Sequence, residues 1–123
     1  MNKNNSIQPW LSVKNASAAV QFYKNAFDAI ETYRLETPDG LVVRLSVNDA
    51  EFWLSGTSDE SKSSEELAGN IRMILITNEP EKVFEKAIRA GAKEIFPVGE
   101  EYGWKLGRIE DPFGLHWEIG HEL

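Results

Sequence analysis

His116 and Glu118 are two side chains whose types and spacing could support acid–base or metal chemistry. One residue separates them, so in a regular strand both point to the same face. An imidazole and a carboxylate on one face could assist a metal ion, and a carboxylate in a partly dry cleft can have its pKa raised, which suits it to abstract a proton. Glu118 is therefore the candidate catalytic residue. The alternatives are a surface position for His116 and, for Glu118, an ion pair with Arg44, Arg72 or Arg108.

Other kinds of catalytic site are excluded by what the sequence lacks. The chain has no Cys, which excludes thiolate catalysis, disulfides and Cys-based zinc sites. It contains no glycine-rich phosphate loop and no nucleophile elbow, and His116 and His121 are too close in sequence to suggest a catalytic triad. We therefore do not expect a hydrolase or a kinase.

Short strands must position the candidate residues. Apolar alternation, together with turn signals such as Pro38-Asp39-Gly40 and Asn48-Asp49, predicts strands. The predicted strands span residues 7–13, 29–36, 41–47, 50–55, 71–76, 93–98, 104–110 and 115–120.

Two helices complete the predicted elements. Apolar residues at helical spacing predict a first helix that is capped by Asn15 or Ser17 and ends near Phe27. For the second helix we expect Asn78 as the cap and Glu81 as its capping-box partner. Gly91 is the expected end of that helix, where left-handed backbone is common.

The order of one strand, one helix and three strands occurs twice along the chain. Aligning Phe22 with Phe84 and Leu11 with Met73 superposes the halves and places Gln8 opposite Asn70. We therefore expect one domain over residues 1–123. It would consist of a first βαβββ unit at 7–56, a Ser-rich acidic connecting loop at 57–69 and a second βαβββ unit at 70–120.

Composition restricts the partners and the location. The formal charge of −7 would repel nucleic-acid phosphates and anionic membranes, so neither is an expected partner. The sequence contains no apolar stretch long enough to cross a membrane and no signal-peptide pattern. A cytoplasmic location is the expectation that follows.

Three stretches carry a resemblance to a known family. They are QPWLSVKNASAAVQFYKNAF at residues 8–27, RAGAKE at 89–94, and EDPFG followed by LHWEI at 110–119. Together they resemble the vicinal oxygen chelate superfamily, which includes glyoxalase, bleomycin-resistance proteins and extradiol dioxygenases. Asp28 and Ala29 stand where that family usually has Gly after the first helix. The resemblance implies an α+β glyoxalase-like fold, in which curved mixed sheets enclose a cleft that commonly holds a divalent metal.

The resemblance also places four metal-ligand positions, at Gln8, Trp53, Asn70 and Glu118. Trp53 has only an N–H donor and so cannot ligate a metal. The neutral amide oxygen of Asn70 is a weak ligand for nickel or zinc. Only Gln8 and Glu118 remain as plausible ligands, so we expect no cofactor, with a divalent metal as the alternative.

Aromatic side chains favour a binding pocket over a metal centre. Trp117, next to Glu118, should pack on the helix side of its sheet. Trp10, Trp53 and Trp104 are the candidate cleft walls, with core packing as the alternative. The polar residues expected to orient a ligand are Gln8, Asn70, Arg72, His116 and Glu118.

Two functional hypotheses follow, and they belong to different classes. The first is a glyoxalase- or bleomycin-resistance-like protein that binds a small aromatic or amphipathic molecule without a full metal site. The second is a metal-dependent lyase or isomerase that uses Gln8 and Glu118. A third, purely structural role would apply if the sheets left no cavity. The resemblance further implies a homodimer, which the central loop is long enough to form with or without exchange of units.

Overall fold

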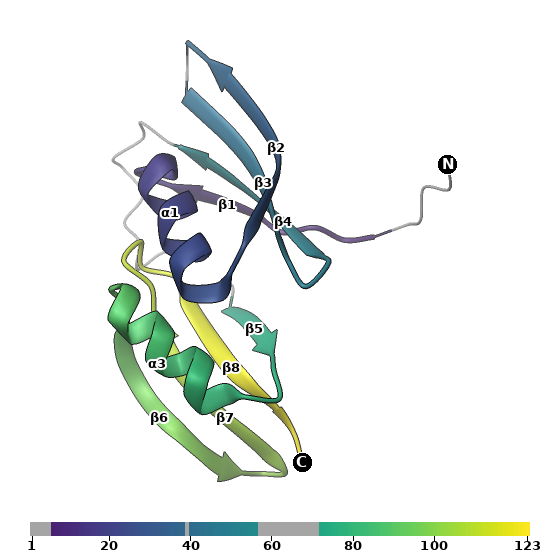
Figure 1. The fold of residues 1–123 in the computed structure, drawn as a ribbon, viewed down its shortest axis with the longest axis vertical. Helices are drawn as coiled ribbons and strands as arrows, with labels where there is room; N and C mark the ends of the chain where they lie inside the picture. The colour runs from purple at the N-terminus through teal and green to yellow at the C-terminus, as the bar shows by residue number, and fades with distance from the viewer. Residues whose placement is uncertain (1–5, 39, 57–71) are drawn as a thin grey trace.

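The computed structural model describes residues 6–38, 40–56 and 72–123, and it contains two similar halves (Figure 1). The first half comprises β1 (Trp10–Val13), α1 (Ala16–Phe27), β2 (Ile30–Thr37), β3 (Gly40–Val47) and β4 (Ala50–Gly56). The second comprises β5 (Arg72–Ile76), α3 (Pro80–Ala90), β6 (Lys93–Glu101), β7 (Trp104–Glu110) and β8 (His116–Glu122). The connection at 57–69 and Asn70 lie outside the described residues.

Each half forms its own four-stranded mixed sheet. The strand orders are β1-β4-β3-β2 and β5-β8-β7-β6, with the first strand of each half parallel to its neighbour and the other pairs antiparallel. The predicted α+β class with curved mixed sheets is confirmed. The two sheets are not closed into one structure, because no strand pairing joins them within the described residues.

The ends of α1 follow the sequence signals. Asn15 is the N-cap, and its side chain accepts a hydrogen bond from the Ala18 N–H. At the other end Asp28 has φ 57°, in the left-handed region, and its N–H bonds to the Tyr23 carbonyl. Left-handed backbone at this position explains why Gly is usual here, and Asp tolerates it better than most residues.

The predicted start of α3 was wrong. The N-cap is Glu79 rather than Asn78, and it makes no side-chain capping bond. Pro80 occupies the start of the helix and keeps the preceding residue out of helical conformation, which moves the cap to Glu79. The Thr77 hydroxyl instead accepts a bond from the Glu79 N–H. Gly91 does end the helix, as predicted.

The two halves pack together through their helix-covered faces, with α1 and α3 side by side (Figure 1). Trp117 of β8 is buried against Tyr23 and Phe27 of α1, with ring centroids 5.3 and 4.9 Å away. The predicted helix-side position of Trp117 is confirmed. Burying a side chain of this size contributes about 1.5–3 kcal/mol, so the contact ties the halves into one core.

The opposite face of each sheet is uncovered and carries exposed apolar side chains. Strand register places Ile30, Tyr33 and Leu35 of β2 on the open face of the first sheet, level with Ser46, Arg44 and Val42. Seven of the exposed large hydrophobic residues lie on the two open faces: Trp10, Ile30, Tyr33, Leu35, Ile74, Ile76 and Phe96.

Candidate functional site

An aromatic cluster occupies the open face of the first sheet. Trp10 and Trp53 are cross-strand neighbours whose rings stack at 5.7 Å with an interplanar angle of 15°. Tyr33 meets Trp53 edge-on at 5.5 Å, and the Arg44 guanidinium lies 5.3 Å from the Trp53 ring centroid. Trp10 nevertheless remains 52% exposed, so the cluster presents a stacking surface to solvent.

Hydrogen bonds orient both indoles of the cluster. Trp53 Nε1 donates to Gln8 Oε1 at 2.8 Å, and Trp10 Nε1 donates to the Ser55 hydroxyl at 2.9 Å. Because an indole has no other polar atom, each ring is held in place by one donor. The amide oxygen of Gln8 is therefore engaged within the chain.

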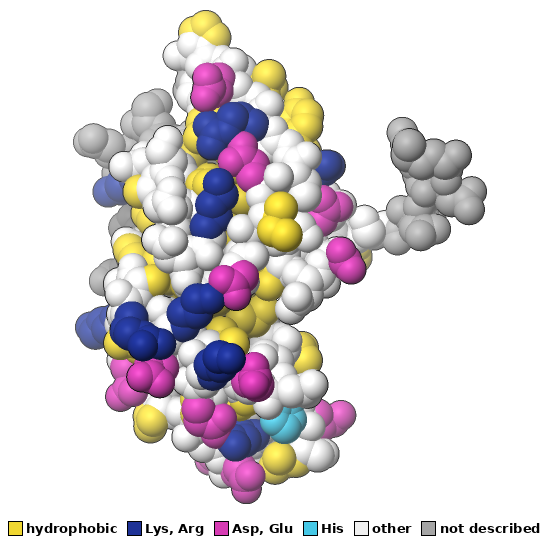
Figure 2. Space-filling view, in the orientation of Figure 1, with side chains coloured by type: hydrophobic (Ala, Val, Ile, Leu, Met, Phe, Trp, Pro, Cys, Tyr) yellow, Lys and Arg dark blue, Asp and Glu magenta, His cyan; other side chains and the backbone are white. Residues whose placement is uncertain are grey.

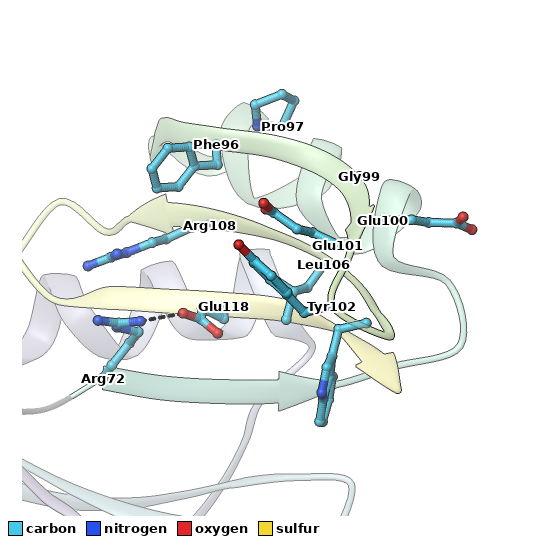
Figure 3. A pocket seen from close by; sticks show the side chains of 11 residues that line it. Arg72, Phe96, Pro97, Gly99, Glu100, Glu101, Tyr102, Leu106, Arg108 and Glu118 are labelled. Atoms are coloured by element: carbon cyan, nitrogen blue, oxygen red, sulfur yellow. Dashed lines mark hydrogen bonds and ion pairs between the residues drawn. The ribbon is translucent and has the colours of Figure 1, made fainter. Parts of the chain in front are cut away.

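A pocket of about 530 Å³ lies on the open face of the second sheet (Figure 3). Its apolar walls come from β6, β7 and the turn between them: Phe96, Pro97, Tyr102, Trp104 and Leu106. Its charged lining residues are Arg72, Arg108, Glu100, Glu101 and Glu118. Aromatic walls combined with charged groups that can orient a ligand are typical of a small-molecule pocket.

Glu118 forms an ion pair at the floor of this pocket. Arg72 Nη1 lies 2.5 Å from Glu118 Oε1, and the two side chains come from the neighbouring strands β5 and β8. One of the ion pairs considered for Glu118 is thus present. The pair is partly exposed, so its contribution to stability is modest.

His116 lies beside the pocket and connects two charged residues. Arg108 Nε donates to His116 Nδ1 at 2.9 Å, and His116 Nε2 lies 3.4 Å from Glu110 Oε1. Since Nδ1 accepts, Nε2 carries the proton in this arrangement. The imidazole therefore holds the Arg108 side chain rather than lining the pocket itself.

Strand pairing corrects the alignment of the two halves. Arg44 is level with Trp53 in the first sheet, as Arg108 is with Glu118 in the second. Trp10 is likewise level with Trp53, and Ile74 with Glu118. Trp10 in the first half therefore corresponds to Ile74 in the second. Two positions earlier in each half, the counterpart of Gln8 is Arg72, not Asn70.

This correspondence gives both halves the same arrangement. In each, the side chain just before or at the start of the first strand bonds directly to the fourth-strand side chain: Gln8 to Trp53, and Arg72 to Glu118. Two of these four groups, the indole and the guanidinium, are donors without a free lone pair for a metal. The positions that the resemblance assigns to a metal thus do not suit one here. Within the described residues, no group of three His, Asp or Glu side chains is placed to hold an ion.

The structure divides the predicted site residues between two surfaces. Arg72, Trp104 and Glu118 line the pocket on the second sheet, whereas Gln8, Trp10 and Trp53 lie on the first. Asn70 lies outside the described residues. Phe96 and Arg108 also line the pocket, and our site prediction omitted both. Alternation along β7 could have identified Arg108, because it places Arg108 on the same face as Trp104.

Charge on the helix-covered side is mixed. Lys and Arg side chains lie among Asp and Glu over α1 and α3, and no continuous basic surface forms on the face in view (Figure 2). Ion pairs such as Lys86–Asp28 contribute to this pattern. Among the described residues, neither helix is long and apolar enough to cross a membrane.

The fold thus consists of two βαβββ units, with a pocket on the open face of the second sheet, as the resemblance to glyoxalase-like proteins implies. A family model for the glyoxalase/bleomycin resistance protein/dioxygenase superfamily matches residues 5–119, and the chain belongs to this superfamily. The resemblance inferred from the sequence is confirmed.

Relatives cover nearly the whole chain. The uncharacterized protein Mb0911c of Mycobacterium bovis is 29% identical over 132 residues, spanning 100% of this chain and 87% of its own length. The X-ray structure of the Arabidopsis thaliana gene product At5g48480 is 28% identical, with a TM-score of 0.75 and coverage of 97% of this chain and 100% of that chain. The fosfomycin resistance protein FosX of Listeria monocytogenes is 13% identical and shares the fold, with a TM-score of 0.77 and coverage of 100% and 96%.

Proposed function

We propose that this protein binds a small aromatic or amphipathic molecule on the open faces of its sheets, without a complete metal site. The observation that carries the proposal is the pocket of about 530 Å³, whose walls are aromatic and whose floor is charged. Aromatic walls supply contact area for a ligand ring, and the charged groups orient it.

The chemistry of the residues at the metal positions supports a binding role that does not depend on a metal. FosX of Listeria monocytogenes has been solved as a complex with Mn(II), so a metal is compatible with this fold. In this chain, however, the Gln8 oxygen bonds to Trp53 and the Glu118 carboxylate to Arg72. A metal would have to displace both partners, and the freed indole and guanidinium could not ligate it.

A second copy of the chain is the proposed partner. The apolar side chains on the two open faces would be costly to leave in water. In a two-fold dimer the open face of the first sheet of one copy can cover that of the second sheet of the other, and the reverse contact forms at the same time. This arrangement would bring the Trp10–Trp53 stack over the partner's pocket and enclose the ligand.

Titration of 2-naphthamide by isothermal calorimetry tests ligand binding in the pocket. Trp104→Ala should weaken binding about tenfold, because a stacked ring contributes on the order of 1 kcal/mol beyond its buried area. Lys105→Ala is the matched control, since its side chain lies on the opposite face of β7 and pairs with Glu81. Equal losses of affinity in both variants would contradict the proposal.

Metal analysis distinguishes the competing lyase or isomerase. After incubation with Mn²⁺, Ni²⁺ or Zn²⁺ and gel filtration, the native protein should retain less than one equivalent of metal. Stoichiometric metal that is lost in Glu118→Ala would replace the binding proposal with the metal-dependent enzyme.

A further inference from the structure

Two arginines stand at one end of the pocket on the second sheet. Arg72 on β5 and Arg108 on β7 flank the central strand β8, and register places both on the open face, level with His116 and Glu118. Figure 3 shows both guanidinium groups extending toward the same end of the pocket. This end therefore concentrates two guanidinium groups, each positively charged.

Most donors of these two groups are available to a ligand. Within the described residues, Arg72 makes one hydrogen bond, from Nη1 to Glu118, and Arg108 makes one, from Nε to His116. Each guanidinium has five N–H donors in a fixed fork, and no described residue engages the terminal nitrogens of Arg108. Because His116 is itself next to Glu110, the Arg108 side chain is held by a chain of contacts from β8 and β7.

The other end of the pocket has the opposite charge. Glu101 is level with Trp104 next to the β6–β7 turn, whereas Phe96 is level with Arg108. In Figure 3 the Glu100 side chain points away from the pocket, so Glu101 is the carboxylate that faces in at the turn end. A negative group on a ligand would be repelled from Glu101 and attracted to the arginines, and the apolar walls lie between these ends.

We propose that Arg72 and Arg108 form an oxyanion subsite, and that the ligand is a small aromatic carboxylate or phosphate ester. Its anionic group lies between the two guanidinium groups, and its ring lies against Phe96, Leu106 and Trp104. A planar guanidinium pairs bidentately with either oxyanion, which adds direction as well as energy. This inference rests on the binding function proposed above and specifies its ligand class.

Glu118 has a defined part in this subsite. Its carboxylate occupies one donor of Arg72 in the ligand-free protein and so competes with an incoming anion. It also holds Arg72 in position, since the arginine side chain is half-exposed and otherwise mobile. Neutralising Glu118 should therefore free Arg72 and strengthen anion binding.

Calorimetric titration with three ligands of one shape tests the subsite. The ligands are 2-naphthoate, 2-naphthyl phosphate and the neutral 2-naphthamide, titrated into the native protein and into Arg72→Gln and Arg108→Gln. Each substitution should weaken both anions about tenfold, as expected for loss of one charge-assisted bond, and leave 2-naphthamide within about twofold. The difference between the naphthoate and phosphate arms identifies which oxyanion the subsite prefers. Arg34→Gln, on the edge strand β2 of the first sheet, is the control.

Glu118→Gln provides a result that a misfolded variant cannot mimic. The affinity for 2-naphthoate should rise severalfold while that for 2-naphthamide is unchanged. Equal binding of anions and amide, with no effect of Arg72→Gln or Arg108→Gln, would overturn the oxyanion subsite and leave the binding function standing. Absence of binding by all three ligands would instead contradict the binding function itself.

Discussion

Asp111 is a buried charged residue that joins the two halves of the molecule. Only 3% exposed, it accepts hydrogen bonds from the Tyr23 hydroxyl at 2.5 Å, from Trp117 Nε1 at 2.9 Å and from the N–H groups of Phe113 and Leu115. Burial raises its pKa, although these hydrogen bonds act in the opposite direction. Burial also raises the pKa of Tyr23 well above its usual value, with the nearby carboxylate adding to the effect.

The raised pKa of Asp111 predicts a pH-dependent stability difference between the native protein and Asp111→Asn. The folded state holds the Asp111 proton more tightly than the unfolded state, so its contribution is fully present below the usual pKa of Asp and is lost as pH rises through the folded pKa. The free energy of unfolding of the native protein, relative to the variant, should therefore decrease as the pH rises above about 4, the usual pKa of Asp.

Urea unfolding at a series of pH values measures this difference. Glu31 and Glu81, whose pKa values are lowered by hydrogen bonds from Arg34 and Lys105, change stability in the opposite direction. Both carboxylates are present in the native protein and in Asp111→Asn, so their contributions cancel when the two free energies of unfolding are subtracted. A difference that grows with pH would mean that hydrogen bonding, not burial, controls the ionisation of Asp111.

At the scale of elements, the pairing of β7 with β8 depends on a close backbone approach at Gly120. A Cβ atom at this position would lie 2.6 Å from the Leu106 Cα, and Leu106 is its partner in the neighbouring strand. The obstruction is backbone, which cannot rotate away as a side chain can. These two strands carry Arg108 and Glu118, so the site depends on this pairing.

Gly120→Ala should therefore be strongly destabilising. We expect a loss of about 3 kcal/mol or more in the free energy of unfolding, at the upper end of the range for overpacking. Gly99→Ala in β6 is the control, because the nearest atom to its added Cβ is 4.0 Å away. Chemical denaturation followed by tryptophan fluorescence compares the two, and similar stabilities would show that β7 and β8 can separate locally without cost.

At the scale of the whole molecule, the packing of the halves through their helices leaves both open sheet faces outside. The aromatic stack and the charged pocket therefore lie on different faces of one chain, and the proposed dimer is what would bring them together. This is why the ligand site and the oligomeric state are expected to depend on each other.

Leu35→Lys should weaken the proposed dimer. Leu35 lies on the open face of β2, level with Val42, and a charge there would have to be buried at the interface. Glu36→Lys is the control, since the adjacent residue points to the other face of the same strand. Light scattering after gel filtration should show a dimer for the native protein and the control, and a monomer for Leu35→Lys at micromolar concentration. A monomeric native protein would refute the dimer.

Local signals in the sequence determined most of the elements. Alternation set the strands and their faces, Asn15 and Gly91 set two helix ends, and the motif residues around Trp117 identified the family and hence the fold. These features depend on residues close together in the chain, where side-chain period and backbone preference are decisive. The prediction of where α3 starts was wrong for a local reason too, because Pro80 outweighed the capping preference of Asn78.

Only the tertiary structure decided which side chains meet. Alternation places Arg72 on the same face as Asn70, and the resemblance places Glu118 on the cleft side, but neither shows which residue of β8 lies level with Arg72. Two parallel strands far apart in the chain keep the same faces when their register shifts by two residues. The observed register makes Arg72 the counterpart of Gln8, and each of these two side chains bonds to a side chain of the fourth strand in its own half. The register also places Arg108 level with Glu118 and therefore at the site. Glu118 was identifiable from its neighbours in sequence, whereas its partner depended on how strands distant in the chain align.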